Sequence, residues 1–193
     1  PANWTPLMDA DGAAVLPHDE GRSLDHPRAF KDFVVVTGRE DGFTQIWVAP
    51  LNSSGDNAPV AAQAHRLKFE ADAFTARLGA NAEFDPKQQL RVTYSSTTTP
   101  GSTMQYDINS KAYEVLKVAP VPNYDATLYD TERLEVPARD GVKIPVTLFW
   151  RKDQKKPNMP THLYGYGSYG ISMDPSFSAS RLALVDRGIC YAI

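Results

Sequence analysis

The feature that most constrains this chain is a succession of short β-type segments in its first 118 residues, with no convincing helix between them. Residues 33–37 and 43–48 are rich in β-branched and aromatic side chains, and the glycine- and acid-containing stretch 38–42 predicts a hairpin turn between them. Further strand-like segments lie at residues 65–69, 90–95, 103–108 and 112–116. Antiparallel strands at such short spacing are typical of a propeller, a sandwich or a barrel.

The character of the sequence changes at about residue 119. Residues 119–124 contain two prolines in three positions, which predicts an extended linker. Two strand-like segments follow at 132–136 and 142–150, and the Asp140-Gly141 pair between them predicts a second hairpin.

The last part of the chain has a different order of elements. Residues 161–167 run from a short strand into a glycine-rich turn, and a helix is predicted over 177–187. Ser176 or Ser178 would cap the start of this helix, and Gly188 lies where a C-terminal cap glycine belongs. A final apolar strand is expected directly after Gly188. Strand, glycine-rich loop, helix and strand are the beginning of an α/β layer arrangement.

Both ends of the chain suggest a piece of a longer protein. The first residue is Pro1 rather than Met, and the chain stops within the apolar run 188–193. Termini usually lie exposed, whereas this run is expected to be a strand that is broken off without a neighbour. Such an unpaired apolar strand would favour aggregation if the chain were a complete module.

Composition argues against several classes of protein. The chain is 42% hydrophobic and 22% charged, which is ordinary for a soluble globular protein, and its net charge of −3 without a basic stripe argues against a nucleic-acid partner. No apolar run approaches the ~18 residues of a membrane span, and no secretory signal is visible. The single Cys190 allows neither an internal disulfide nor a CxxC pair, which suggests a cytoplasmic protein.

Several separated segments resemble a known family. In chain order they are YSSTTTP at 94–100, RLEVPARDGV at 133–142, LYGYGSYG at 163–170, FSASRL at 177–182 and DRG at 186–188. Together they closely resemble the prolyl oligopeptidase family of serine peptidases, and its oligopeptidase B branch in particular. The resemblance is strongest over residues 91–193.

The resemblance implies a mixed fold, in which a seven-bladed β-propeller caps an α/β-hydrolase domain. Residues 1–118 would be the C-terminal blades of the propeller, which are antiparallel and all-β. Residues 119–193 would be the linker and the N-terminal part of the α/β-hydrolase (peptidase) domain, with its first strands and helix. Most of the family's length would lie outside this chain.

The glycine-rich turn carries the main functional expectation. In α/β-hydrolases the loop after the third strand supplies part of the oxyanion hole. The resemblance implies that Tyr166 donates its phenolic O–H to the oxyanion, while Gly165 and Gly167 let the backbone bend on both sides of the ring. Taken without the resemblance, the same residues could form a tight strand-to-helix turn whose aromatic rings only pack.

By the same resemblance, Tyr169 lines the primary specificity pocket of the peptidase. The sequence GSYG at residues 167–170 is the form found in the oligopeptidase B branch, and this branch favours substrates with Arg or Lys before the cleaved bond. The acidic residues that would bind such a cation are expected outside this chain.

No residue of this chain is expected to act as nucleophile, acid or base. Ser168 does not fit the Gly-x-Ser-x-Gly pattern because Tyr166 lies two residues before it, and the family's catalytic serine, acid and histidine are expected past Ile193. The four histidines lack metal-ligand spacing, so neither a metal nor a cofactor is expected. The hydroxyl-rich run 95–99 is predicted to be a strand end with a turn, because it lacks the glycines and lysine of a phosphate-binding loop.

The sequence therefore predicts a fragment of a serine endopeptidase that hydrolyses short peptides after Arg or Lys, with the propeller restricting access to oligopeptides. The chain alone is expected to be inactive, and its partners are the oligopeptide substrates and the remainder of the parent chain. Two alternatives stay open: a prolyl-specific or acyl-peptide-releasing relative, and a non-catalytic β-rich binding module.

Overall fold

The chain divides into two compact units, each built from segments that are not contiguous in sequence. Unit 1 comprises Pro1–Lys68, Ala76–Thr93 and Thr103–Leu116, and unit 2 comprises Phe69–Thr75, Tyr94–Ser102 and Lys117–Ile193. The computed structural model describes residues 7–52 and 58–193, without the side chain of His26.

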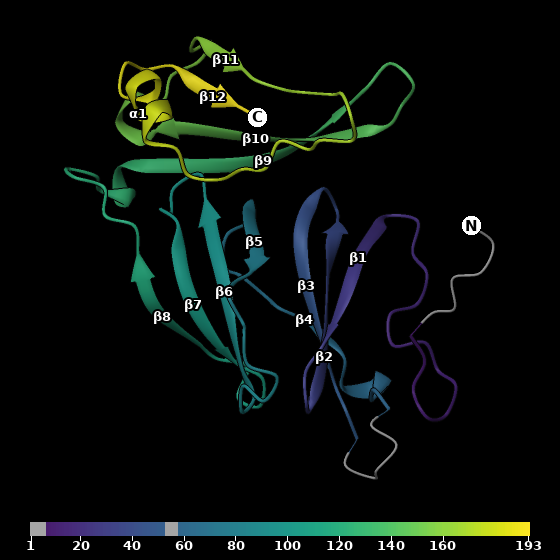
Figure 1. The fold of residues 1–193 in the computed structure, drawn as a ribbon. Coiled ribbons are helices and arrows are strands. Elements are labelled where there is room, and N and C mark those ends of the chain that lie inside the picture. Colours follow the sequence, from purple (N-terminus) through teal and green to yellow (C-terminus); the bar gives the residue numbers. More distant parts are fainter. Residues whose placement is uncertain (1–6, 53–57) are drawn as a thin grey trace. The chain divides into compact units, whose positions relative to one another are not determined.

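The first sheet contains four strands that pair in sequence order (Figure 1). They are β1 (Arg22–Ala29), β2 (Phe33–Glu40), β3 (Phe43–Pro50) and β4 (His65–Arg66), and each pair is antiparallel. The predicted β2–β3 hairpin is confirmed, with Asp41 and Gly42 as its two left-handed turn residues at φ 56° and 83°. The strand predicted over 65–69 is shorter than expected.

The second sheet repeats this order. Its strands are β5 (Phe74–Leu78), β6 (Gln89–Ser96), β7 (Ser102–Asp107) and β8 (Tyr113–Val118). The strands predicted at 90–95, 103–108 and 112–116 are thereby confirmed to within two residues at each end. Four strands paired in sequence order make up one blade of a β-propeller.

Neither β1 nor β5 was predicted from the sequence. The β1 sequence RSLDHPRA lacks apolar alternation and contains Pro27, which cannot donate a ladder hydrogen bond. The strand accommodates this proline at an irregularity of register between Leu24 and Pro27, because β1 is an outer strand of its sheet. β5 does bury alternate residues, Phe74 and Ala76, and could have been recognised by that period.

Gly38 lies within β2 and not in the turn that the sequence predicted for residues 38–42. It pairs with Leu24 of β1, beside the irregular register. A Cβ atom at Gly38 would lie 2.1 Å from the carbonyl oxygen of Ser23, so the two backbones approach too closely for any larger residue. Only Asp41 and Gly42 are left to form the turn.

The third sheet belongs to unit 2 and has the order β11-β12-β10-β9. β9 (Tyr129–Pro137) and β10 (Lys143–Arg151) form the second predicted hairpin, whose turn contains Gly141 at φ 85°. β12 (Cys190–Ala192) pairs antiparallel with β10 and parallel with β11 (Thr161–Leu163). Residues 7–52 and 58–193 also form three short 3₁₀ helices, η1 (Ala61–Gln63), η2 (Ala126–Leu128) and η3 (Lys152–Gln154).

The expectation that the last strand is unpaired is wrong. β12 is an inner strand of its sheet, and beyond it the N–H of Ile193 donates to the carbonyl of Thr147 at 3.0 Å, while the N–H of Thr147 donates back at 2.7 Å. The outer strands are β11 and β9. The aggregation argument against a binding module therefore does not apply to β12.

The helix predicted over 177–187 is present but shorter, as α1 (Ala179–Val185). Ser178 is its N-cap residue, although the Ser178 hydroxyl hydrogen-bonds the Ser180 hydroxyl and not the helix backbone. Gly188 has the left-handed φ of 78° that the sequence predicted for a glycine after the helix. None of the helices formed by the described residues has the length and apolar content that crossing a bilayer requires.

Each unit has its own core. In unit 1 the side chains of Val35 and Val48 on one face of the β2–β3 hairpin are buried, and so are those of Val36 and Trp47 on the other, so both faces are covered. One core cluster of unit 2 contains Tyr129, Phe149, Val185 and Tyr191, which come from β9, β10, α1 and β12. The Tyr129 hydroxyl donates to the Asp186 carboxylate at 2.7 Å, and Arg151 also donates to that carboxylate at 3.2 Å, which fastens the end of α1 to the sheet.

We expect Gly38→Ala to lower the free energy of unfolding by about 2 kcal/mol or more, because the added methyl group overlaps the Ser23 carbonyl. Urea denaturation followed by circular dichroism measures the change. Gly101→Ala is the matched control, since a Cβ atom there has no neighbour within 4 Å, and its stability should be unchanged or slightly higher. Equal stability of the two variants would contradict the close approach.

We expect the chain to lose stability as the pH rises from about 10 to about 12. Burial, followed by the hydrogen bond and charge of Asp186, raises the pKa of Tyr129 to about 12, whereas an unfolded tyrosine ionises near 10. The unfolded state therefore releases a proton that the folded state retains, so this stability is complete below pH ~10 and declines above it. Tyr129→Phe should show a shallower decline over this range and an unchanged pH dependence from pH 7 to 9, and parallel curves above pH 10 would contradict the assignment.

Candidate functional site

The glycine-rich turn is part of a loop, residues 164–178, that connects β11 to α1 within unit 2. The loop has no regular secondary structure. Its first residue is held by the sheet, because the N–H of Tyr164 donates to the carbonyl of Ala192 at 2.8 Å. We call this segment the β11–α1 loop.

The two tyrosines predicted to act on substrate both lie in this loop and both are exposed. The side chain of Tyr166 is 46% exposed, and that of Tyr169 is 92% exposed. Among the described residues, none hydrogen-bonds the phenol of Tyr166. Neither ring is buried by the part of the chain that the structure describes.

Tyr169 has an unusual backbone conformation. Its φ is 58° and that of Gly170 is 66°, while the N–H of Ile171 donates to the carbonyl of Ser168 at 3.1 Å. Two successive left-handed residues inside such a bond define a type I′ turn, in which asparagine or glycine is preferred at the first position. The left-handed conformation of a tyrosine costs roughly 1–2 kcal/mol of folding free energy, and because the ring is exposed, burial of the ring does not offset this cost.

Gly165 and Gly167 differ from Gly170. Neither has a φ in the left-handed region, and a Cβ atom at either position would have no neighbour within 4 Å. The described residues thus leave open space beside both glycines. Their predicted role in bending the backbone around Tyr166 stays a prediction.

The far end of the loop contacts a segment that the sequence analysis did not connect with it. The N–H of Phe177 donates to the hydroxyl of Ser95 at 2.9 Å, across 82 positions of sequence. Ser95 belongs to the hydroxyl-rich run at the end of β6, where the predicted turn is confirmed by a bond from the N–H of Ser96 to the carbonyl of Thr99. No sequence signal relates these segments, because the contact depends on the fold of unit 2.

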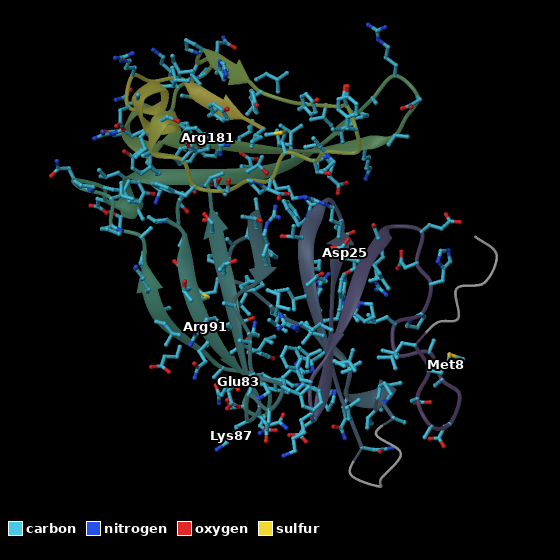
Figure 2. All side chains as sticks on the ribbon, in the orientation of Figure 1. Met8, Asp25, Glu83, Lys87, Arg91 and Arg181 are labelled. Atoms are coloured by element: carbon cyan, nitrogen blue, oxygen red, sulfur yellow. The ribbon has the colours of Figure 1, made fainter. Side chains whose placement is uncertain are left out.

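His162 and Arg181 both pack against the ring of Tyr191. The ring of His162 lies 5.1 Å from that of Tyr191, and the guanidinium of Arg181, labelled in Figure 2, lies 4.9 Å from the same tyrosine ring. Burial raises the pKa of the Cys190 thiol. No group of three or more His, Cys, Asp or Glu side chains in residues 7–52 and 58–193 is arranged to hold a metal ion.

A cavity of about 730 Å³ lies within unit 1, and none of the β11–α1 loop lines it. Its lining is mostly polar. The Nε2 atom of His65 there contacts the Tyr106 hydroxyl at 2.9 Å, and the Oδ1 atom of Asn52 is buried without a hydrogen-bond partner among the described residues. The lining residues are Lys31, Asp32, Pro50, Leu51, Asn52, Ala62, Gln63, His65, Gln88, Ile108, Asn109 and Lys111.

Comparison with known proteins agrees with the blade-like sheets. The family model described as the N-terminal β-propeller domain of prolyl oligopeptidase matches residues 6–119, which is more than half of the chain. The antiparallel sheets therefore define a β-propeller region of a peptidase family. The chain belongs to the prolyl oligopeptidase family, whose members are serine peptidases.

Individual relatives match the chain over most of its length. Dipeptidyl aminopeptidase BI of Pseudoxanthomonas mexicana is 43% identical over 85% of this chain and 22% of its own length. Protease 2 of Moraxella lacunata is 31% identical over 96% of this chain and 26% of its own length. The solved structure of oligopeptidase B from Trypanosoma brucei is similar with a TM-score of 0.83 and 35% identity, over 94% of this chain and 26% of that one. The chain thus spans about a quarter of the length of these relatives.

We expect Tyr169→Asn to raise the free energy of unfolding by about 0.5–1 kcal/mol, because asparagine adopts the left-handed conformation at lower cost. Tyr166→Asn is the control in the same loop, and since Tyr166 has an ordinary φ, no such gain is expected from it. Urea denaturation of both variants measures the difference. A loss of stability in Tyr169→Asn would show that the exposed ring contributes to folding.

Proposed function

We propose that this chain is part of a serine endopeptidase that hydrolyses short peptides after Arg or Lys, and that Tyr166 supplies a hydrogen bond to the oxyanion. The observation that carries the proposal is the place of the β11–α1 loop. It joins the third strand of the unit 2 sheet in chain order to the first helix. In α/β-hydrolases the loop between the third strand and the first helix contributes to the oxyanion hole.

The chemistry of acyl transfer explains why an exposed phenol belongs in this place. Attack of a serine on a peptide carbonyl places negative charge on the carbonyl oxygen, and donors already aimed at that oxygen stabilise the transition state. A tyrosine whose O–H is already hydrogen-bonded within its own fold could not donate to the oxyanion. The ring of Tyr166 is 46% exposed, and no described residue hydrogen-bonds its phenol. The left-handed Tyr169 on the same loop presents a second aromatic ring, which we assign to the wall of the specificity pocket.

The proposal includes the division of the chain into residues 1–118, the last propeller blades, and 119–193, the linker and the first part of an α/β-hydrolase domain. Two observations support this division. The family match stops at residue 119, and β11 and β12 pair in parallel and are connected by a segment that contains α1. The nucleophile, acid and base would belong to the remainder of the parent chain, as would the acidic residues for a basic substrate. No cofactor is part of the proposal, and the lone Cys190 supports a cytoplasmic location.

A second candidate activity is release of dipeptides from a free N-terminus. It is favoured by the 43% identity to a relative that is named a dipeptidyl aminopeptidase. Assays of the full-length protein would separate the candidates, with four classes of substrate: amino-blocked peptides with Arg or Lys, the same with Pro, N-acetylated peptides, and dipeptidyl substrates with a free amine. Turnover restricted to the last class would replace the endopeptidase proposal.

We expect Tyr166→Phe in the full-length protein to lower kcat by roughly 10²–10³-fold with little change in KM, because one oxyanion donor is lost. Tyr164→Phe is the matched control, since Tyr164 lies in the same loop and is 42% exposed. Its kcat should equal that of the wild type. An unchanged kcat in Tyr166→Phe, or an equal loss in both variants, would remove Tyr166 from the proposed role.

A further inference from the structure

The β11–α1 loop is fastened at both of its ends. At its start, the N–H of Tyr164 is bonded to the carbonyl of Ala192. At its end, the Ser95 hydroxyl accepts the N–H of Phe177 at 2.9 Å, and the guanidinium of Arg181 donates to the carbonyl of Ser176 at 2.7 Å. Tyr166 lies between these anchors, so the place of its phenol depends on them.

The Ser95 hydroxyl is suited to be a fixed anchor. It donates its one hydrogen to the carbonyl of Thr99 at 3.0 Å, which leaves its lone pairs free to accept from Phe177. The turn that holds it is itself cross-bonded, since the Ser96 hydroxyl accepts the N–H of Thr99 at 3.0 Å and that of Thr98 at 3.3 Å. Ser95 is only 9% exposed, so water competes little for these bonds.

A second contact connects the same turn with the same residue. The ring of Phe177 packs edge-on against that of Tyr124 with a centroid distance of 4.9 Å. The Tyr124 hydroxyl in turn donates to the carbonyl of Thr98 at 2.6 Å. The turn 95–99 therefore holds Phe177 by its backbone through Ser95 and by its ring through Tyr124, and all of these residues belong to unit 2.

We propose that Ser95 is a positioning residue of the peptidase, which sets the place of Tyr166 by anchoring the end of the β11–α1 loop. This inference rests on the proposed function. Without the hydroxyl, the N–H of Phe177 has lost its acceptor inside the fold, and the end of the loop can separate from the turn. A displacement of about 1 Å in a group that contacts the transition state can lower a rate by up to 10²-fold.

The test uses the full-length protein with Ser95→Ala, Ser95→Thr and the matched control Ser102→Ala. Ser102 follows the same turn in sequence, is 4% exposed, and donates to the carbonyl of Pro100 at 2.9 Å, and it has no hydrogen bond to the described residues of the β11–α1 loop. We expect Ser95→Ala to lower kcat roughly 10-fold with a change in KM below about twofold, because the Tyr124 contact remains. Ser95→Thr keeps the hydroxyl and should restore most of the rate, and Ser102→Ala should match the wild type.

Two further measurements separate this inference from the proposed function. Hydrogen exchange of the amides at 176–178 should become faster in Ser95→Ala and not in Ser102→Ala, whatever the enzyme's activity. In a Tyr166→Phe background, Ser95→Ala should cause little further loss of kcat, because Ser95 acts through Tyr166.

Each outcome then has one meaning. Unchanged exchange in Ser95→Ala, equal losses of kcat in Ser95→Ala and Ser102→Ala, or independent effects of Ser95→Ala and Tyr166→Phe on kcat would each overturn the positioning role. Faster exchange together with an unaffected kcat in Tyr166→Phe would retain the anchor and reject the oxyanion assignment instead.

Discussion

The parallel pairing of β11 with β12 is the constraint on which the rest of unit 2 depends. Two neighbouring parallel strands cannot be joined by a tight turn, so the chain between them must cross from one end of the sheet to the other. Residues 164–189 form this crossover, and they include α1 as well as the loop with Tyr166 and Tyr169. β12 also pairs with β10, which binds the crossover to the β9–β10 hairpin. The exposed loop is thus a consequence of the sheet's connectivity.

Within that crossover, the helix and the loop differ in burial. Val185 of α1 is fully buried in the core, and Asp186 accepts hydrogen bonds from Tyr129 and Arg151. The middle of the loop instead exposes two tyrosine rings and keeps one of them in a left-handed conformation. Backbone strain of this kind occurs often at ligand-binding sites. This contrast is the physical reason to assign function to the loop and stability to the helix.

The hydroxyl-rich turn at 95–99 shows how one short segment can serve two parts of a fold. Its side chains satisfy the turn's own backbone, as in the bonds of Ser96 to the amides that follow it. The same turn accepts bonds from Phe177 and Tyr124, which lie in later segments of unit 2. In addition, the Thr97 hydroxyl lies 2.6 Å from that of Thr131 on β9. A run that looks like an ordinary polar turn is therefore a connecting point of unit 2.

Local sequence patterns were sufficient to predict most of the strands, the two hairpins, the helix and the family, but not β1 or β5. Hairpins around Asp41-Gly42 and Asp140-Gly141 could be predicted because turn conformation depends on the few residues in the turn. Tertiary structure alone decided which strands are neighbours. Gly38 is required by the backbone of Ser23, β12 is an inner strand, and Ser95 meets Phe177 across 82 positions. These features depend on backbones and side chains that are distant in sequence, and no local pattern of residues encodes which distant partner they will meet.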